Sequence, residues 1–353
     1  MPPAHRHRTR VNHWKRTAIR GVTIHPVRRF FLRILTALQL TRITTAFAAV
    51  ANVWFVILWS HASRFEPATA AFFTLPIWAL LLGGTLNALG LFGFATALND
   101  VLDWRRDQAL HPDRPIPSGR VSLDGAISLV VCTLGAAVLG ATMLGMTAVL
   151  LTLLIAAAIL FFNAAGKYIP AIGLVVLGLI YAGQMVVPNL NLRFVIPVWV
   201  VMTHALLVAL ATHVLGRKAP GLSARAGVFA VIGWLFWTGV MFAFGWSRNR
   251  NDGGLWPDWV PLSHGLWILL LAAAYILLVW KRLSSLGRGP RVAEKIARYG
   301  ALWLPLYGAA WLFAQGNTRG GWLLTLLAAL GLVGMTLLRE AVALIEQPMG
   351  YRR

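Results

Sequence analysis

Ten long apolar segments constrain this chain more than any other feature of its sequence. They lie at roughly residues 43–60, 71–98, 122–143, 146–165, 169–188, 194–215, 225–246, 262–280, 297–315 and 321–338. A helix needs about 20 mostly apolar residues to cross a bilayer, and lipid leaves helices and closed barrels as the spanning structures. Because 58% of the residues are hydrophobic and 12% are charged, a soluble domain is excluded. We predict an all-α, polytopic bundle of nine or ten transmembrane helices.

Basic residues are distributed unequally between the segments that join the apolar runs. If the N-terminus is cytoplasmic, the inside segments after residue 42 hold Arg105, Arg106, Arg114, Arg120, Lys167, Arg217, Lys218, Lys281, Arg282, Arg288, Arg291, Lys295, Arg339, Arg352 and Arg353. The outside segments hold Arg64, Arg193, Arg248, Arg250 and Arg319. This asymmetry follows the positive-inside rule and predicts a protein of the cytoplasmic membrane with a cytoplasmic N-terminus. Anionic lipid headgroups explain the net charge of +21, so no nucleic-acid partner is expected.

The charge pattern also suggests how the chain is divided. Residues 1–29 contain eight Arg or Lys and no acid, which is typical of an arm lying on anionic lipid. We expect residues 1–42 to be a basic arm with an interfacial lead-in, 43–340 the membrane domain and 341–353 a short cytoplasmic tail. The single cysteine, Cys132, excludes a disulfide within the chain.

The acidic residues are concentrated in one stretch, "NDVLDWRRDQALHPDRPIPSGRVS", at residues 99–122. Five of the eleven acids lie within 25 positions, namely Asp100, Asp103, Asp107, Asp113 and Asp124. The stretch also contains four arginines and three prolines, of which the two in "DRPIPSG" stiffen the turn before Gly119. A surface patch that merely offsets nearby arginines would explain such a cluster, but the scarcity of acid elsewhere favours a functional site.

Helical spacing would bring four oxygen-bearing side chains of this stretch together. Asn99, Asp103 and Asp107 follow one another at four-residue intervals, and Asp100 falls within the same arc of about 100°. Hard oxygen ligands without His or Cys suit Mg²⁺, which takes one or two carboxylates and completes its shell with water and phosphates. With arginines beside it at a membrane surface, such a site suits a diphosphate whose tail enters the bilayer.

The same stretch resembles the first aspartate-rich motif of the UbiA superfamily of intramembrane prenyltransferases, which has the form N-D-x-x-D-x-x-x-D. The resemblance implies a helical bundle around a central cavity that opens to the cytoplasm and to lipid. It implies Mg²⁺ as cofactor, a polyprenyl diphosphate donor and a lipophilic acceptor that attacks the allylic carbocation. Carried over to this chain, Asn99 and Asp103 are catalytic metal ligands, Asp107 assists them, and Asp100 is a further candidate ligand.

The chain departs from the family pattern after the sixth apolar segment. The family carries a second acidic motif there, whereas residues 211–227, "ATHVLGRKAPGLSARAG", contain no Asp or Glu. Either Arg217 and Lys218 hold the diphosphate directly and leave one metal ion on the first motif, or they are ordinary cytoplasmic basic residues. The loss also leaves open a protein that binds or transports a prenyl lipid without transferring it.

Other basic residues are candidates for the diphosphate site. Family members often carry a diphosphate-binding lysine where this chain has Lys167, and we add Arg42 and Arg114, which lie at the same predicted face. Each of them is also explained as an ordinary basic residue of a cytoplasmic segment, as the positive-inside rule expects. A solute transporter is less favoured because the charged cluster lies at a membrane face rather than at mid-membrane. A phosphatidyltransferase is less favoured because its D-x-x-D-G-x-x-A-R pattern is missing.

Overall fold

The computed structural model describes residues 45–67 and 69–346, with side chains as far as residue 337. Within those ranges the chain forms helices and loops and no strand. The helices are α2 (Phe47–Ala62), α3 (Ala70–Thr74), α4 (Ile77–Leu102), α5 (Trp104–Leu110), α6 (Leu123–Thr142), α7 (Met146–Ala164), the 3₁₀ turn η2 (Gly166–Tyr168), α8 (Pro170–Met185), α9 (Ile196–Leu215), α10 (Ala224–Arg248), α11 (Ser263–Leu286), α12 (Pro290–Ala314) and α13 (Thr318–Glu346). The basic arm and Arg42 lie outside the described residues.

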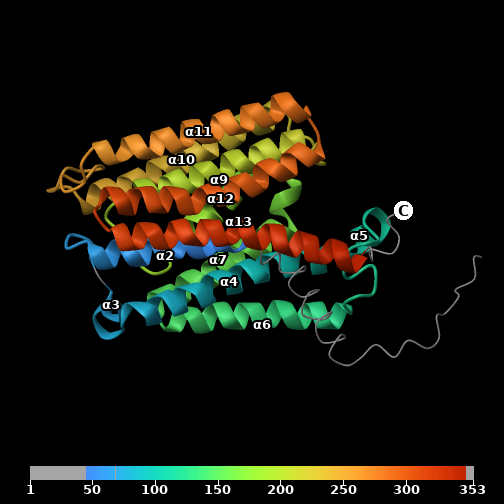
Figure 1. Cartoon of the computed structure of the whole chain (residues 1–353), viewed down its shortest axis with the longest axis horizontal. Coiled ribbons are helices and arrows are strands. Elements are labelled where there is room, and N and C mark those ends of the chain that lie inside the picture. The colour runs from blue at the N-terminus through green and yellow to red at the C-terminus, as the bar shows by residue number, and fades with distance from the viewer. Residues whose placement is uncertain (1–44, 68, 347–353) are drawn as a thin grey trace, which may run out of the picture.

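The long helices run along one common axis, with α5 at one end of the bundle and α3 at the other (Figure 1). Seven of the described helices are long and apolar enough to cross a membrane, and α2 and α8 are shorter apolar helices. Each of the ten predicted apolar segments overlaps a helix of at least 16 residues, so the all-helical prediction is confirmed. The exact number of spans and the side to which the interior opens remain predictions.

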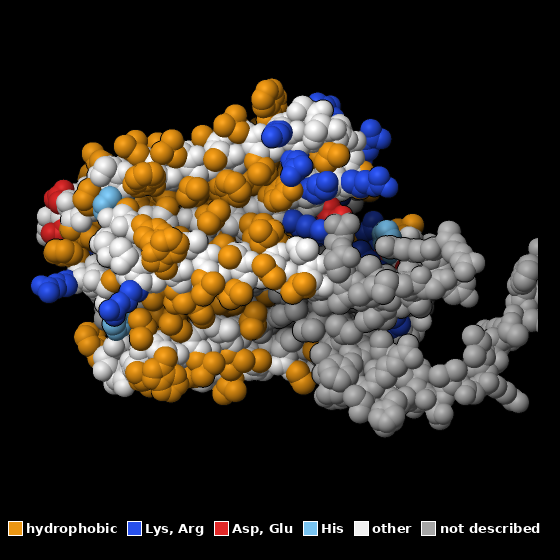
Figure 2. All heavy atoms as spheres, in the orientation of Figure 1, with side chains coloured by type: hydrophobic (Ala, Val, Ile, Leu, Met, Phe, Trp, Pro, Cys, Tyr) orange, Lys and Arg blue, Asp and Glu red, His pale blue; other side chains and the backbone are white. Residues whose placement is uncertain are grey.

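Side-chain chemistry is distributed over the bundle as a membrane protein requires. Hydrophobic side chains cover the length of the face shown in Figure 2, and Lys and Arg gather at the end that bears α5. Large apolar side chains such as Leu139, Leu150, Phe236 and Leu269 are exposed on the outer helices. In water this area would drive aggregation, whereas lipid solvates it.

Helix α2 lies at the centre of the bundle. Thirteen of its sixteen residues are buried, and its side chains contribute to two apolar clusters. One cluster joins α2 to α8, α9 and α12, and the other joins it to α4, α6 and α7. A helix that is hydrophobic on every face is stable where neighbours cover it all round.

Glycine allows α4 and α6 to pack with their backbones in contact. A Cβ atom at Gly90 would lie 2.4 Å from the Ala137 nitrogen, and one at Gly140 would lie 2.4 Å from the Asn87 nitrogen. The Asn87 amide also donates to the Ala137 carbonyl (3.0 Å) and to Thr152 Oγ1 on α7 (2.8 Å). Small residues and interhelical hydrogen bonds of this kind hold helices together in lipid.

Several helix boundaries differ from the prediction, and two of them depend on proline. The segment 71–98 is divided into α3 and α4 at Pro76, because proline donates no backbone hydrogen bond and disfavours helix in the residue before it. Helix α12 begins at Pro290, seven residues before the predicted start, with proline in its first turn. Its first turns carry Arg291, Lys295 and Arg298. These charged residues lower the local hydropathy, so an analysis of apolar runs places the start of the helix too late.

A buried acid anchors the loops at the end opposite α5. The Glu66 carboxylate is 5% exposed and accepts hydrogen bonds from the backbone nitrogens of Arg193 (2.6 Å) and Phe194 (3.1 Å) and from Trp59 Nε1 (3.1 Å). Burial raises the pKa of Glu66, and these hydrogen bonds oppose that shift. This one side chain therefore connects the loop after α2 to the loop before α9.

We expect Glu66→Ala to lower the midpoint of thermal unfolding in detergent sharply. The substitution leaves three buried donors without a partner, at about 1–3 kcal/mol each. The control is Glu294→Ala, which removes an exposed ion pair with Arg298 on one helix and should cost about 0.5 kcal/mol or less. Equal midpoints for the two variants would contradict the anchoring role of Glu66.

Candidate functional site

The acidic stretch continues the line of α4 beyond the end of that helix. Helix α4 ends at Leu102 and α5 begins at Trp104, with Asp103 between them in a helical conformation. The Asp103 nitrogen donates to the Asn99 carbonyl (3.0 Å), and the Asp107 nitrogen donates to the Asp103 carbonyl (2.8 Å). The four-residue spacing therefore places Asn99, Asp103 and Asp107 on successive turns, as the sequence predicted.

Asn99 and Asp103 converge on the ammonium group of Lys167. Lys167 Nζ lies 3.0 Å from Asn99 Oδ1 and 2.7 Å from Asp103 Oδ2, and the side chains of the Lys167–Asp103 pair are 16% and 13% exposed. Lys167 reaches them from η2, the turn between α7 and α8. This contact joins the acidic motif to a part of the chain more than 60 residues away.

The other oxygen of Asp103 is held by Tyr168, which the sequence analysis did not single out. Tyr168 donates its hydroxyl to Asp103 Oδ1 (3.0 Å). Partial burial, and then this hydrogen bond to a carboxylate, raises the pKa of Tyr168, so the phenol remains a donor at neutral pH. The one sequence feature that could have identified Tyr168 as a site residue is its position next to Lys167.

The two remaining acids of the motif face a different cation, Arg114. Arg114 Nη1 lies 2.5 Å from Asp107 Oδ2 and 3.8 Å from Asp100 Oδ1. Asp107 and Asp100 are 3% and 7% exposed. Asn99 and Asp103 therefore face Lys167, whereas Asp107 and Asp100 face Arg114, and the Asn99 amide links the two pairs by donating to Asp100 Oδ1 (3.3 Å).

A turn closes the motif and leads into α6. Arg120 donates to the Asp113 carbonyl oxygen and to Ser118 Oγ (3.1 Å). Gly119 has φ of 74°, a conformation that favours glycine. The Ser122 hydroxyl then accepts from the Gly125 nitrogen (3.1 Å) and caps α6. This turn holds the segment that carries Arg114 close to the acids.

A polar chamber of about 440 Å³ lies between the acidic motif, η2 and the loop after α9. Its charged lining residues are Asp103, Asp107, Arg106, Arg114, Lys167 and Lys218, and two histidines, His111 and His213, also line it. Four cations face two carboxylates, so the positive lining favours an anionic ligand.

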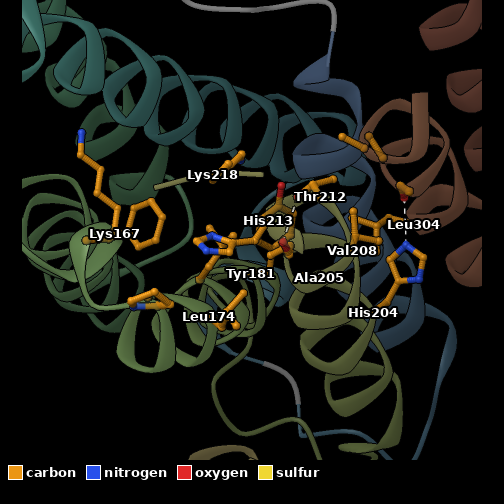
Figure 3. A pocket seen from close by; sticks show the side chains of 18 residues that line it. Lys167, Leu174, Tyr181, His204, Ala205, Val208, Thr212, His213, Lys218 and Leu304 are labelled. Carbon is orange, nitrogen blue, oxygen red and sulfur yellow. Dashed lines mark hydrogen bonds between the residues drawn. The ribbon is translucent and has the colours of Figure 1, made fainter. Parts of the chain in front are cut away.

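Two apolar chambers adjoin the polar chamber. The α4–α7–α8 chamber, of about 290 Å³, extends from Asn99 past Ile155 to Gln184. The α8–α9–α12 chamber, of about 410 Å³, shares Lys167, His213 and Lys218 with the polar chamber. It extends to His204, whose ring lies far from Lys167 in Figure 3, and that histidine is held by the Gly300 carbonyl (3.0 Å).

The loop after α9 places its two basic residues differently. Both residues are exposed, but Lys218 lines the polar and α8–α9–α12 chambers, whereas Arg217 lines neither of them. Arg217 occupies a left-handed turn with φ of 50°. Of the predicted diphosphate ligands, Arg114, Lys167 and Lys218 therefore surround one chamber, Arg217 lies outside its lining, and Arg42 is not among the described residues.

The donor set at Asn99 and Asp103 fits one Mg²⁺ ion. Their oxygens already converge on a single cation, Lys167 Nζ, and Mg²⁺ commonly takes one or two carboxylates with water and phosphate oxygens for the rest. Across the described residues, no three His, Cys, Asp or Glu side chains form a group that could hold a metal ion. The chamber therefore suits a metal ion that binds two protein oxygens and takes its remaining ligands from water and substrate, rather than one coordinated by protein side chains alone.

The helical bundle therefore holds a polar chamber with an excess of cations in its lining, and this chamber adjoins two largely apolar chambers. Residues 53–218 match the UbiA prenyltransferase family. That range contains the whole acidic motif, Lys167 and Lys218. This match, over 166 of the 353 residues, places residues 53–218 in the UbiA superfamily, and the apolar helices make the chain an integral membrane protein.

Several solved structures are similar in fold. One, of digeranylgeranylglyceryl phosphate synthase, has 16% sequence identity and a TM-score of 0.49, with 80% of this chain and 98% of that chain covered. A UbiA homologue from Archaeoglobus fulgidus bound to GPP and Mg²⁺ has 11% identity, coverages of 85% and 99%, and a TM-score of 0.41. The apo structure of a UbiA homologue from Aeropyrum pernix K1 has 17% identity, coverages of 83% and 97%, and a TM-score of 0.40. No curated protein matches the chain.

We expect Arg114→Ala to destabilise the protein by about 2–3 kcal/mol, because it leaves the nearly buried Asp107 and Asp100 without their cation. The matched control is Arg105→Ala on α5, where the guanidinium lies over the Trp104 ring (5.6 Å) and is exposed. Thermal unfolding in detergent should separate the two variants clearly. An Arg114→Ala midpoint equal to that of Arg105→Ala would show that the Arg114 ion pairs do not stabilise the site.

Proposed function

We propose that this protein transfers a polyprenyl group from a prenyl diphosphate to a lipid-soluble acceptor within the membrane. The observation that carries the proposal is the junction of the polar chamber with two apolar ones, at the point where Asn99 and Asp103 converge on Lys167. A prenyl diphosphate has a polyanionic head and a hydrocarbon tail, and this junction offers a matching environment for each.

The chain's own cations would bind the diphosphate. Lys167, Arg114 and Lys218 line the polar chamber from the turn after α7, the acidic motif and the loop after α9. In the reaction, the bond between prenyl C1 and the diphosphate oxygen breaks and its electron pair leaves with the diphosphate. The acceptor then bonds to C1 and loses a proton. Fixed cations that face the departing diphosphate stabilise the charge that develops on it.

Asn99 and Asp103 would hold the cofactor Mg²⁺, and Asp107 would support it through water. When bound, Mg²⁺ supplies further positive charge to the leaving diphosphate. The apolar walls of the α4–α7–α8 and α8–α9–α12 chambers would exclude water from the allylic cation, which water otherwise captures.

We further propose that the polar chamber faces the cytoplasm and that the protein resides in the plasma membrane. The α5 end of the bundle carries the larger share of basic residues (Figure 2), in keeping with the positive-inside rule. Residues 1–42 would then form a basic arm on the same face, beside the 43–340 membrane domain and the 341–353 tail.

A transfer assay tests the proposal. Purified protein in nanodiscs would receive radiolabelled geranylgeranyl diphosphate, with a lipid extract as the source of acceptors. Diphosphate release and labelled lipid would be measured with Mg²⁺, with EDTA and in Asp103→Asn. We expect turnover that requires Mg²⁺ and falls at least 100-fold in Asp103→Asn, because that variant loses a negative ligand at the charged centre.

The alternative is a protein that binds or carries a prenyl lipid without transferring it. Two observations favour it: residues 211–227 contain no acid, and Lys167 pairs with Asp103. Saturable binding of the labelled diphosphate without turnover would support this alternative. Absence of both binding and turnover would contradict both functions.

The loop after α9 offers a matched pair of variants. Lys218 lines the polar chamber and its neighbour Arg217 does not. We expect Lys218→Ala to weaken binding of geranylgeranyl diphosphate about tenfold, the usual scale of a charge-assisted hydrogen bond. Arg217→Ala should change it less than about twofold. Both affinities would be measured by radioligand binding in nanodiscs. Equal losses of affinity in the two variants would indicate a general effect of positive charge and contradict a direct contact between Lys218 and the diphosphate.

A further inference from the structure

Three side chains separate the two apolar chambers. Phe162, Leu177 and Tyr181 line both the α4–α7–α8 and the α8–α9–α12 chamber, and Phe162 also lines the polar chamber. In Figure 3, Tyr181 lies in the middle of the pocket, between Lys167 on one side and His204 on the other. Two substrates that enter separate chambers must meet at this boundary, because a bond has to form between them.

Tyr181 is the boundary residue with a polar group, and that group lacks a protein partner. No other described residue forms a hydrogen bond with the Tyr181 hydroxyl, although the side chain lies within α8 at the centre of the bundle. Two other interior tyrosines do have partners. Tyr275 donates to the Ile296 carbonyl (3.1 Å), and Tyr307 lies 3.4 Å from His204 Nδ1.

The Tyr181 side chain is half-buried and borders open space on two sides, so its hydroxyl can form a hydrogen bond with a molecule in a cavity. Because the Tyr181 side chain borders both cavities, a ligand in either of them can supply the missing partner. A hydroxyl at this boundary that bonds to no described residue is available to an oxygen atom of a ligand.

The α4–α7–α8 chamber is suited to a hydrocarbon chain. Away from Asn99 and Tyr181, three of its polar side chains donate to backbone carbonyls of the surrounding helices: Thr96 to Phe92 (3.0 Å), Asn163 to Ile159 (3.1 Å) and Gln184 to Ala88 (3.4 Å). Apolar side chains such as Leu91 and Ile155 form much of the remaining wall. A ligand that makes no hydrogen bonds, such as the tail of the proposed donor, matches this lining.

We propose that the α8–α9–α12 chamber binds the lipid-soluble acceptor and that the Tyr181 hydroxyl forms a hydrogen bond with a hydroxyl or carbonyl oxygen of that acceptor. This inference rests on the proposed function, since it names the second substrate of the same site. It places an oxygen of the acceptor at the boundary where the donor tail begins. Tyr181 is then an acceptor-binding residue and takes no part in holding the diphosphate.

The test compares two probes that differ in one oxygen-bearing group, 1-naphthol and 1-methylnaphthalene. Their saturable binding would be measured on the full chain and on Tyr181→Phe in nanodiscs, with empty nanodiscs subtracted. We expect the preference for 1-naphthol to be about tenfold larger in the unmodified protein than in Tyr181→Phe, the scale of one hydrogen bond. Unchanged preference in the variant, or no saturable binding of 1-naphthol to the unmodified protein, would overturn the proposal.

Tyr275→Phe is the matched control, because Tyr275 has a protein partner and lines neither apolar chamber. It should keep the preference for 1-naphthol and lower the midpoint of thermal unfolding. Tyr181→Phe should lose the preference at an unchanged or higher midpoint, since it removes a hydroxyl that has no protein partner. A lowered midpoint in Tyr181→Phe would instead indicate a structural role and contradict the proposal.

The transfer assay separates this inference from the proposed function. If Tyr181→Phe abolishes the probe preference while the unmodified protein shows no transfer, the function fails and the binding site stands. If transfer occurs and the preference survives in Tyr181→Phe, the function stands and the inference alone fails. Affinity for geranylgeranyl diphosphate should be the same in both proteins.

Discussion

The contact on which the site depends is the one between Lys167 and the pair formed by Asn99 and Asp103. One ammonium group joins the end of α4 to the turn between α7 and α8, at distances of 3.0 and 2.7 Å. Both partners of the ion pair are largely shielded from solvent, so their attraction is stronger than at a protein surface and the loss of either charge is costly. The contact fixes the entrance to both apolar chambers, and it shows that the two oxygens can share one cation.

The remaining charges determine what this entrance can bind. Arg114 pairs closely with Asp107 and more distantly with Asp100. The wall formed by the loop after α9 contributes His213 and Lys218, and residues 211–227 contain no acid. The polar chamber therefore has one oxygen-rich wall and one cationic wall. Such a pair of walls suits a polyanion that is bound directly on one side and through a single divalent ion on the other. The two apolar chambers behind it suit the two apolar components of the proposed reaction, the prenyl tail and the lipid-soluble acceptor.

The sequence predicted the features that follow from local physics. The apolar segments predicted the helices because an 18-residue apolar run has few other stable conformations in lipid, and the spacing of Asn99, Asp103 and Asp107 predicted a continuous helical face. It did not predict which cation each acid meets, because Lys167 and Arg114 reach the acids from different parts of the fold. Nor did it distinguish Lys218 from Arg217, which depends on one left-handed residue in a loop. The unpaired hydroxyl of Tyr181 could be recognised only once the hydrogen bonds of its neighbours were known.

The central claim is that Asn99 and Asp103 form a site for one divalent cation in a chamber whose opposite wall is cationic. Electron paramagnetic resonance of Mn²⁺, titrated into the full-length protein in nanodiscs with inorganic diphosphate, tests it most directly. Our account predicts one tightly bound ion per chain, lost in Asp103→Asn and retained in Asp113→Asn. Two tightly bound ions, no bound ion, or binding that survives in Asp103→Asn would contradict it.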